Sequence, residues 1–241
     1  MLPAPAVTGF TADQLRFATA AWPMRAAEEL RSALIYRALA AASRTALPAF
    51  ADRFAAVMRE EVGHARLCAT VGARLGASRP TYDPHPVRAR LAALPDPAAR
   101  VLSLVVHEVA IGETISMAMF REGRRAATEP LTRAAIESIL AEEARHQQLG
   151  WDALATLGPS AAATREATHA LATAEQQIAV PALRFLEAGE HFDPAWAALG
   201  VIEPERRVEA FYQAVEQLVI PRLDRLGLDG ARAWANRYAA G

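Results

Sequence analysis

Three pairs of the form Glu-x-x-His are the residues of this chain best suited to chemistry. Random placement of 19 glutamates and 6 histidines among 241 residues gives roughly 0.5 such pairs. On a helix, a spacing of three places both side chains on one face, about one turn apart, so that a carboxylate oxygen and an imidazole nitrogen can bind the same metal ion. The pairs are Glu61 with His64, Glu143 with His146, and Glu166 with His169.

Two of these pairs have a partner glutamate at a matching position on a preceding helix. The midpoint between Glu29 and Glu61 falls in a break at residues 43–48. The midpoint between Glu113 and Glu143 falls at the expected start of another helix. Because each residue of a helix advances by about 1.5 Å, the two glutamates of each hairpin therefore lie level with each other. The third pair has no such partner, so we expect it to face solvent.

The two halves of this pattern also resemble each other. Tyr36 follows Glu29 by seven residues, and Phe120 follows Glu113 by seven. A spacing of seven puts an aromatic ring two turns further along the same helix face in both halves. This internal similarity indicates a pseudo-twofold arrangement.

Four glutamates and two histidines in this arrangement are the ligand set of a di-iron or di-manganese carboxylate site in a four-helix bundle. Over about residues 23–157, the chain resembles the ferritin-like di-iron carboxylate superfamily. The resemblance implies a centre of two iron ions, although the same oxygen and imidazole ligands suit manganese or a mixed centre. The implied ligands are Glu29, Glu61, His64, Glu113, Glu143 and His146, with Glu61 and Glu143 bridging the two metals.

Other polar residues leave alternatives open. Glu28 and Glu60 adjoin two of the implied ligands and would replace them after a shift of one residue in helical phase, although the aromatic parallel favours Glu29 over Glu28. His107 and Glu108 lie in the most apolar stretch of the chain, where we expect a satisfied buried pair, with a role beside the metal ligands or at an interface as the alternative. In an α-helix, Glu108 would lie about 140° from the neighbouring ligand glutamate and would face away from the metals. Candidates for positions beside the metals or in a substrate pocket are Tyr36, Cys68, Met117 and Phe120.

The composition excludes several classes of function. Alanine supplies 57 of the 241 residues, lysine is absent, and 26 arginines against 27 acidic residues give a net charge of −1. With no basic patch, neither a nucleic acid nor a membrane is an expected partner. The single cysteine, Cys68, excludes a disulfide framework and a CxxC site within one chain, and it favours a cytoplasmic location. The sequence begins without a basic segment, so no secretory signal is expected.

Apolar residues recur at spacings of three and four, which predicts an all-α chain. We expect one domain over residues 1–241, a ferritin-like four-helix bundle in about 23–157 with additional C-terminal helices in about 160–238. Five prolines between residues 78 and 97, with Gly76 just before them, predict a long crossover with at most one helical turn. The fifth helix is expected to use Thr128 as its N-cap. The expected helices span about residues 11–20, 23–43, 49–77, 97–123, 129–157, 160–188, 203–226 and 228–238.

The resemblance also separates the branches of the superfamily. Iron-storage ferritins essentially end after the bundle and a short helix, whereas this chain continues well beyond Gly158, to Gly241. Rubrerythrins usually add an iron site built from two CxxC pairs, and arylamine N-oxygenases usually carry an extra histidine where this chain has Ile139. The chain is most similar to the aldehyde-deformylating oxygenases, whose ligand spacings are nearly the same. This likeness implies the oxygenase and oxidase branch.

We therefore expect a non-haem di-iron or Fe/Mn oxidoreductase that activates O₂ to oxidise a small, largely apolar organic substrate. The expected partners are O₂, that substrate and an external electron donor such as a ferredoxin or a flavoprotein reductase, and the sequence is compatible with a homodimer. One alternative is a ferroxidase or a peroxide-detoxifying protein. A second alternative is a non-catalytic helical binding protein in which the metal is structural.

Overall fold

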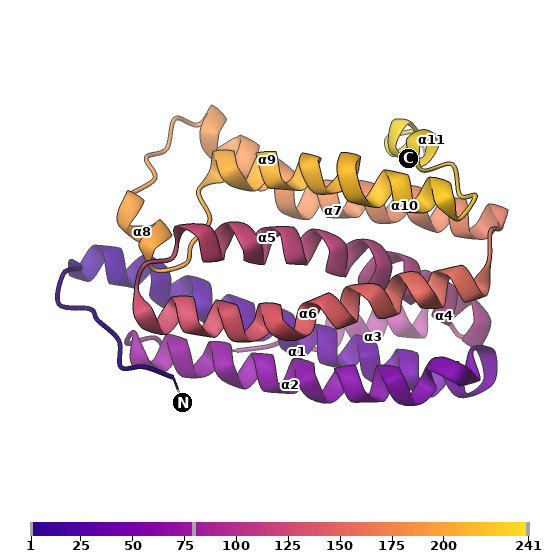
Figure 1. Cartoon of the computed structure of the whole chain (residues 1–241), viewed down its shortest axis with the longest axis horizontal. Helices are drawn as coiled ribbons and strands as arrows, with labels where there is room; N and C mark the ends of the chain where they lie inside the picture. The colour runs from indigo at the N-terminus through magenta and orange to yellow at the C-terminus, as the bar shows by residue number, and fades with distance from the viewer. Residues whose placement is uncertain (1, 79–80, 240–241) are drawn as a thin grey trace.

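The computed structural model describes residues 2–78 and 81–239, and every regular element within them is helical (Figure 1). This confirms the all-α prediction. The α-helices are α1 (Ala12–Ala46), α2 (Ala51–Arg74), α3 (His85–Ala92), α4 (Pro97–Leu104), α5 (Glu113–Ala126), α6 (Pro130–Leu157), α7 (Ala161–Glu187), α8 (Pro194–Ala198), α9 (Pro204–Ala214), α10 (Ile220–Arg225) and α11 (Gly230–Ala235). A 3₁₀ turn, η1 (Pro48–Phe50), and two π-helical segments, η2 (Val105–Gly112) and η3 (Val215–Val219), complete the set.

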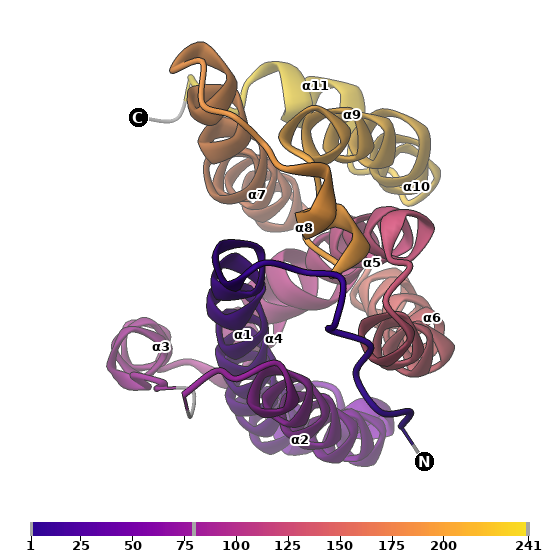
Figure 2. The same ribbon diagram turned by 90° about the vertical axis from the view of Figure 1, so that its left-hand side faces the viewer.

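Four long helical runs lie side by side (Figures 1 and 2). α1 and α2 form one hairpin around η1, and the run from α4 through α5 forms a second hairpin with α6. The hairpins meet where α1 packs against α4 and where α2 packs against α6. A crossover that contains α3 connects them. Around the bundle, each run is antiparallel to the two runs that it packs against (Figure 1), and side chains at the middle of each run can meet at one level inside the bundle.

α1 is one continuous helix, although the sequence predicted two helices separated just before Pro23. Proline lacks the amide hydrogen, and inside an exposed helix it costs about 3 kcal/mol. Here the ring of Pro23 packs against α2, since a Cβ placed on Gly72 would lie only 3.3 Å from Pro23 Cδ. At the start of the helix, Thr11 and Gln14 form a capping box. Tertiary packing and a good cap thus keep the helix intact through the proline.

Three smaller features also differ from the expectation. α3 has eight residues, about two turns instead of at most one, and it lies within the predicted crossover, of which residues 79–80 fall outside the described residues. The N-cap of α6 is Glu129 and not Thr128, because the Glu129 carboxylate accepts a hydrogen bond of 2.7 Å from the Thr132 amide. The sequence did not predict α8, since five residues are too few to show a helical period.

The π-helical segment η2 changes which residues of its run share a face. The amide of Glu113 donates to the carbonyl of Glu108, five residues earlier, where an α-helix would use a carbonyl four residues earlier. The wider turn brings these two residues nearer to one face of the run, and both side chains line the same cavity. Glu108 thus lies closer to the face of Glu113 than regular α-helical geometry predicts, although its carboxylate belongs to neither Glu/His cluster that could hold a metal ion.

The C-terminal helices form a layer over one side of the bundle (Figure 2). α7 packs on η2, α9 packs on α5, and α11 packs on α7. One buried carboxylate ties this layer together. Glu175 of α7 accepts hydrogen bonds from Tyr212, Arg237 and Tyr238, and the Nε to Oε2 distance to Arg237 is 2.6 Å. The layer covers the side of the bundle that η2 and α5 form.

The continuous run Pro97–Ala126 is long and apolar enough to span a membrane by length and composition. Inspection of the apolar stretches in the sequence did not predict this, because charged and polar residues interrupt them. In the structure, 67% of the most apolar 18-residue segment of this run is buried inside the protein. A core helix of a soluble protein has this character, and the arrangement is compatible with a soluble protein.

Candidate metal centre

The six implied ligands come from all four long runs of the bundle and meet in its interior. None of them is more than 7% exposed. Such burial is rare for glutamate unless a partner or a metal compensates the charge. α1 supplies Glu29, α2 supplies Glu61 and His64, α5 supplies Glu113, and α6 supplies Glu143 and His146.

These side chains form two overlapping groups. Each residue of a group offers one ligand atom, either an imidazole nitrogen or a carboxylate oxygen. Within each group these atoms all lie within 4.8 Å of one another, which is close enough for one ion to contact them all. Glu61 and Glu143 belong to both groups, as the resemblance implies for bridging carboxylates. The first group is Glu29, Glu61, His64 and Glu143, and the second is Glu61, Glu113, Glu143 and His146.

Four buried atoms in this cluster have no hydrogen-bond partner among the described residues: Nδ1 of His64, Nδ1 of His146, Oε1 of Glu61 and Oε2 of Glu143. His146 Nδ1 lies 3.0 Å from Glu61 Oε1, and His64 Nδ1 lies 3.2 Å from Glu143 Oε1. These atoms approach one another without the alignment of a hydrogen bond. A buried polar atom without a partner costs about 1 to 3 kcal/mol, so atoms that converge in this way fit a cation between them.

The donor set suits hard divalent metals. Carboxylate oxygens with one imidazole per group favour ions such as Fe(II) and Mn(II), and no thiolate takes part. The cluster could therefore hold a metal ion in each group. Several divalent ions accept these ligands.

The electrostatics of the cluster point the same way. Burial raises the pKa of Glu29 and of Glu113 well above the usual value of 4.5, and neighbouring carboxylates add to the effect. Burial alone would lower the pKa of His146, but Glu143 and Glu61 outweigh it and raise this pKa to about 11. Without metal, protons therefore balance the buried negative charge. Two divalent cations can take the place of these protons.

The second nitrogen of each imidazole binds a carboxylate from the opposite hairpin. His64 Nε2 lies 3.0 Å from Glu142 Oε2, and His146 Nε2 lies 2.7 Å from Glu60 Oε2. This exchange fixes the ring orientation, directs Nδ1 inward and raises the basicity of the ring. Sequence reasoning treated Glu60 only as a competitor for a ligand position. The signal that could have identified this role is the repeated Glu-Glu-x-x-His pattern, in which the first glutamate of each copy serves the histidine of the other.

Tyr36 contacts the cluster directly. Its hydroxyl donates a hydrogen bond of 2.8 Å to Glu113 Oε1, and the side chain is 1% exposed. Burial and the charge of Glu113 raise the pKa of Tyr36 well above 10, so the phenol keeps its proton at neutral pH. Phe120 lines the cavity beside the metal centre. Cys68 and Met117 are buried, but neither is among the described residues that line the two cavities of this region.

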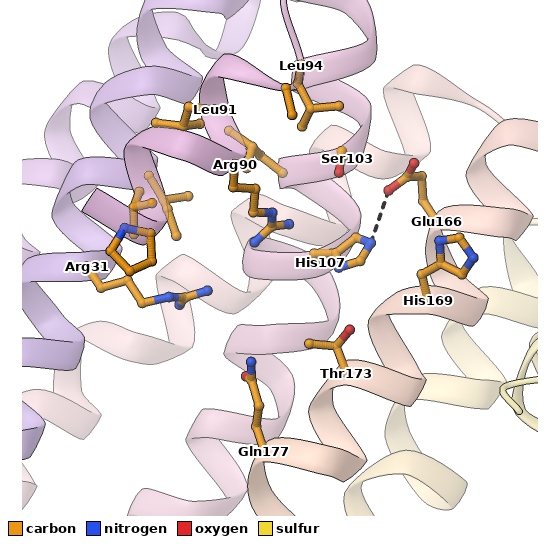
Figure 3. Close-up of a pocket in the computed structure, with 15 residues that line it drawn as sticks. Arg31, Arg90, Leu91, Leu94, Ser103, His107, Glu166, His169, Thr173 and Gln177 are labelled. Carbon is orange, nitrogen blue, oxygen red and sulfur yellow. Dashed lines mark ion pairs between the residues drawn. The ribbon is translucent and has the colours of Figure 1, made fainter. Parts of the chain in front are cut away.

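A cavity of about 540 Å³ extends from the cluster toward the C-terminal layer. Four of the implied ligands lie on its wall, and apolar side chains of α5, α6 and α7 form much of the remainder. A second cavity, of about 500 Å³, adjoins it between α3 and α7 (Figure 3). The two share Arg31, His107, Thr173 and Gln177 as lining residues. A volume of this order accommodates a small organic molecule.

The polar residues of the apolar stretch have partners on other helices. Arg31 binds Glu108 at 2.9 Å, and Arg90 binds the same carboxylate, so Glu108 is satisfied as expected but not by its neighbour in sequence. His107 Nε2 lies 3.0 Å from Glu166 Oε2, the pair marked in Figure 3. Glu166 is thus turned toward the second cavity, which corrects the expectation that it faces solvent. His169 is exposed.

No protein-family model and no curated protein matches the chain.

Proposed function

We propose that this protein is a ferritin-like di-iron oxidase or oxygenase that uses O₂ to oxidise a small organic substrate. The observation that carries the proposal is the pair of overlapping buried ligand groups with unpartnered donor atoms, next to a cavity of about 540 Å³. Two ferrous ions held there would supply electrons to O₂, and an external donor such as a ferredoxin or a flavoprotein reductase would restore them.

Each residue of the centre has a role in this proposal. The six ligands would hold the metals, with Glu61 and Glu143 shared between them. Glu60 and Glu142 hold the imidazole protons at Nε2, so that Nδ1 is left to bind. Tyr36 holds a proton at its hydroxyl oxygen and donates it in a hydrogen bond to Glu113 Oε1. This bond limits the movement of Glu113 and keeps a proton within reach of the centre.

The cavity favours an organic substrate over a protein that only oxidises iron or reduces peroxide. Ferrous ion and hydrogen peroxide are small and polar, and neither needs a chamber of about 540 Å³ with an apolar section beside the ligands. Ile115, Met119 and Ile178 line this one beside the ligands. Such side chains can bind the apolar part of an organic molecule.

The test is anaerobic loading of the metal-free protein with Fe(II), followed by exposure to O₂. We expect two irons per chain, oxidised together to the ferric state in optical and Mössbauer spectra. In Glu61→Ala and His146→Ala, two-metal occupancy should be lost with little change in helix content. The exposed residues Glu137 and His169 provide the matched controls, since Glu137→Ala and His169→Ala should both keep two metals. One metal per chain or none, or two irons inert to O₂, would contradict the proposal.

A further inference from the structure

The cavity beside the metal centre carries an uncompensated positive charge at one end. Apart from the metal ligands, its charged lining residues are three arginines and two glutamates, which gives a net charge of +1 with histidine counted as neutral. Arg31 and Arg90, the latter outside this cavity, both bind Glu108, and the other three residues together carry a charge of +1. The five residues are Arg25, Glu28, Arg31, Glu108 and Arg207.

Arg25 is held in place with one nitrogen left over. Its Nη2 donates a hydrogen bond of 2.6 Å to the carbonyl of Gly200, and its guanidinium stacks 4.8 Å from the centre of the Trp22 ring. Its Nη1 is buried and has no hydrogen-bond partner in the described chain. A guanidinium fixed on two sides loses little entropy when a ligand binds the remaining nitrogen, so it is preorganised for an acceptor.

The shape of the chain at this point depends on Gly200. Its φ of +85° is one that other residues rarely adopt. A Cβ there would lie 3.1 Å from Ile136 and 3.4 Å from Trp22. The glycine thus allows the carbonyl to approach Arg25 while the ring of Trp22 stays beneath it.

Arg207 reaches the same cavity from α9. Over residues 2–78 and 81–239, its side chain makes no hydrogen bond and no ion pair. Burial lowers the pKa of Arg207, and the nearby charge of Arg25 lowers it further. Glu28 attracts both guanidinium groups, but it forms no ion pair with either in the described part of the chain. Two guanidinium groups are thus close enough to repel each other with one carboxylate to offset them.

We propose that the substrate is an organic acid, and that Arg25 and Arg207 bind its carboxylate while its apolar body lies along the cavity toward the metal centre. This inference rests on the proposed function for the reaction, but not for the binding. Planar guanidinium groups bind carboxylates with two parallel hydrogen bonds, and one negative charge matches the excess of +1. A phosphate monoester, which carries nearly two charges, matches less well.

The position of the arginines limits the size of the acid. Arg25 precedes Glu29 by four residues, so it lies about 6 Å along α1 from this ligand and on nearly the same face. Phe120 lies seven residues beyond Glu113 on α5, which runs opposite to α1 (Figure 1), so it is displaced toward the same end of the bundle. The carbon nearest the metals is therefore a few bonds from the carboxylate, as in a short-chain or aromatic acid.

The test is the binding of matched acids and amides to the full chain, measured by calorimetry with and without Mn(II). Hexanoate and benzoate serve as the acids, hexanamide and benzamide as their neutral counterparts, and inorganic phosphate as an anion without an apolar body. We expect each acid to bind about tenfold or more tightly than its amide. Binding of phosphate as tight as that of the acids would overturn the proposal, as would equal binding of acids and amides or no binding of either.

Variants locate the binding site. Arg207→Gln should abolish the preference for acids, and Arg207→Lys should restore part of it, because the ammonium keeps the charge but not the fork. Arg25→Gln should act in the same way, but it also removes the hydrogen bond to the Gly200 carbonyl. The Arg207 variants therefore provide the cleaner test of carboxylate binding. The control is Arg121→Gln, an exposed arginine on α5. Retention of the preference in Arg207→Gln would refute the assignment. Because the measured quantity is the binding of acids, this proposal can fail in a protein that still binds Fe(II) and reacts with O₂. Conversely, acids can bind as expected in a protein that does not react with O₂.

Discussion

Two helical runs approach each other closely beside the candidate metal centre at Gly150 of α6. A Cβ at this position would lie 2.5 Å from the Val109 carbonyl carbon, 2.6 Å from its oxygen and 2.7 Å from the Ala110 amide nitrogen. All three are backbone atoms of η2, which cannot rotate away as a side chain can. To reach an ordinary contact of 3.4 Å, α6 and η2 must separate by about 0.9 Å.

Gly150→Ala should therefore destabilise the protein, although alanine is the better helix former. Overpacking of a core costs typically 1 to 3 kcal/mol, and a clash between two backbones belongs at the upper end of that range. Gly63 provides the control, because it lies exposed within α2 and a Cβ there meets no atom within 4 Å. Gly63→Ala should stabilise the protein by about 0.5 to 1 kcal/mol through helix propensity alone. The two variants receive the same atoms, and their stabilities should move in opposite directions.

The assay is urea unfolding of the metal-free proteins, monitored by circular dichroism, so that metal binding does not mask the difference. We expect the two free energies of unfolding to differ by about 3 kcal/mol. For a chain of this length, this corresponds to about 6 to 12 °C between the melting temperatures. Gly150 follows His146 by one turn, so Gly150→Ala should also bind metal more weakly. If Gly150→Ala proves as stable as Gly63→Ala, the close packing of α6 on η2 is refuted.

Hydrogen bonds from Arg237 and two tyrosines lower the pKa of Glu175 although burial alone would raise it. The stability they provide is therefore fully present above the unfolded pKa of about 4.5 and lost as the pH falls through the folded pKa. Glu175→Gln should lower the free energy of unfolding by about 1 to 3 kcal/mol near neutral pH and by less near pH 3. Urea titrations at the two pH values measure both losses, and equal losses would contradict this prediction. Glu60→Gln deprives His146 Nε2 of its carboxylate and should weaken metal binding by about 10- to 100-fold in competition with a chelator, and unchanged affinity would argue against the pairing. Metal loading should release up to about four protons per chain into weakly buffered solution, from two histidines and two glutamates with raised pKa values, and an absence of release would refute this charge balance.

The repeated ligand spacing determined much of the arrangement of the centre. Because side chains three residues apart share a helix face, Glu61 and Glu143 were expected beside their histidines. Because a hairpin brings equidistant residues level, Glu29 and Glu113 were expected opposite them. The structure brings all of them together in two overlapping groups. Metal binding itself remains a prediction.

The local rules failed where packing between helices overrides the preference of a short segment. Pro23 predicted a helix boundary, but its ring fits against α2 and the helix continues. The α-helical period placed Glu108 away from Glu113, but the π-helical turn brings both side chains to the wall of one cavity. Neither outcome can be computed from neighbours in sequence, because the stabilising contacts come from other helices.

The sequence by itself determined the all-helical class and the residues that could bind metal, because both depend on spacings within a helix or a hairpin. Only the tertiary structure decided which carboxylate orients each histidine, and that Arg25 and Arg207 line one cavity with the ligands. The two arginines are far apart in the chain, one on α1 and the other on α9, and these helices belong to different layers. No periodicity links such positions, so their association depends on how the C-terminal layer packs on the bundle.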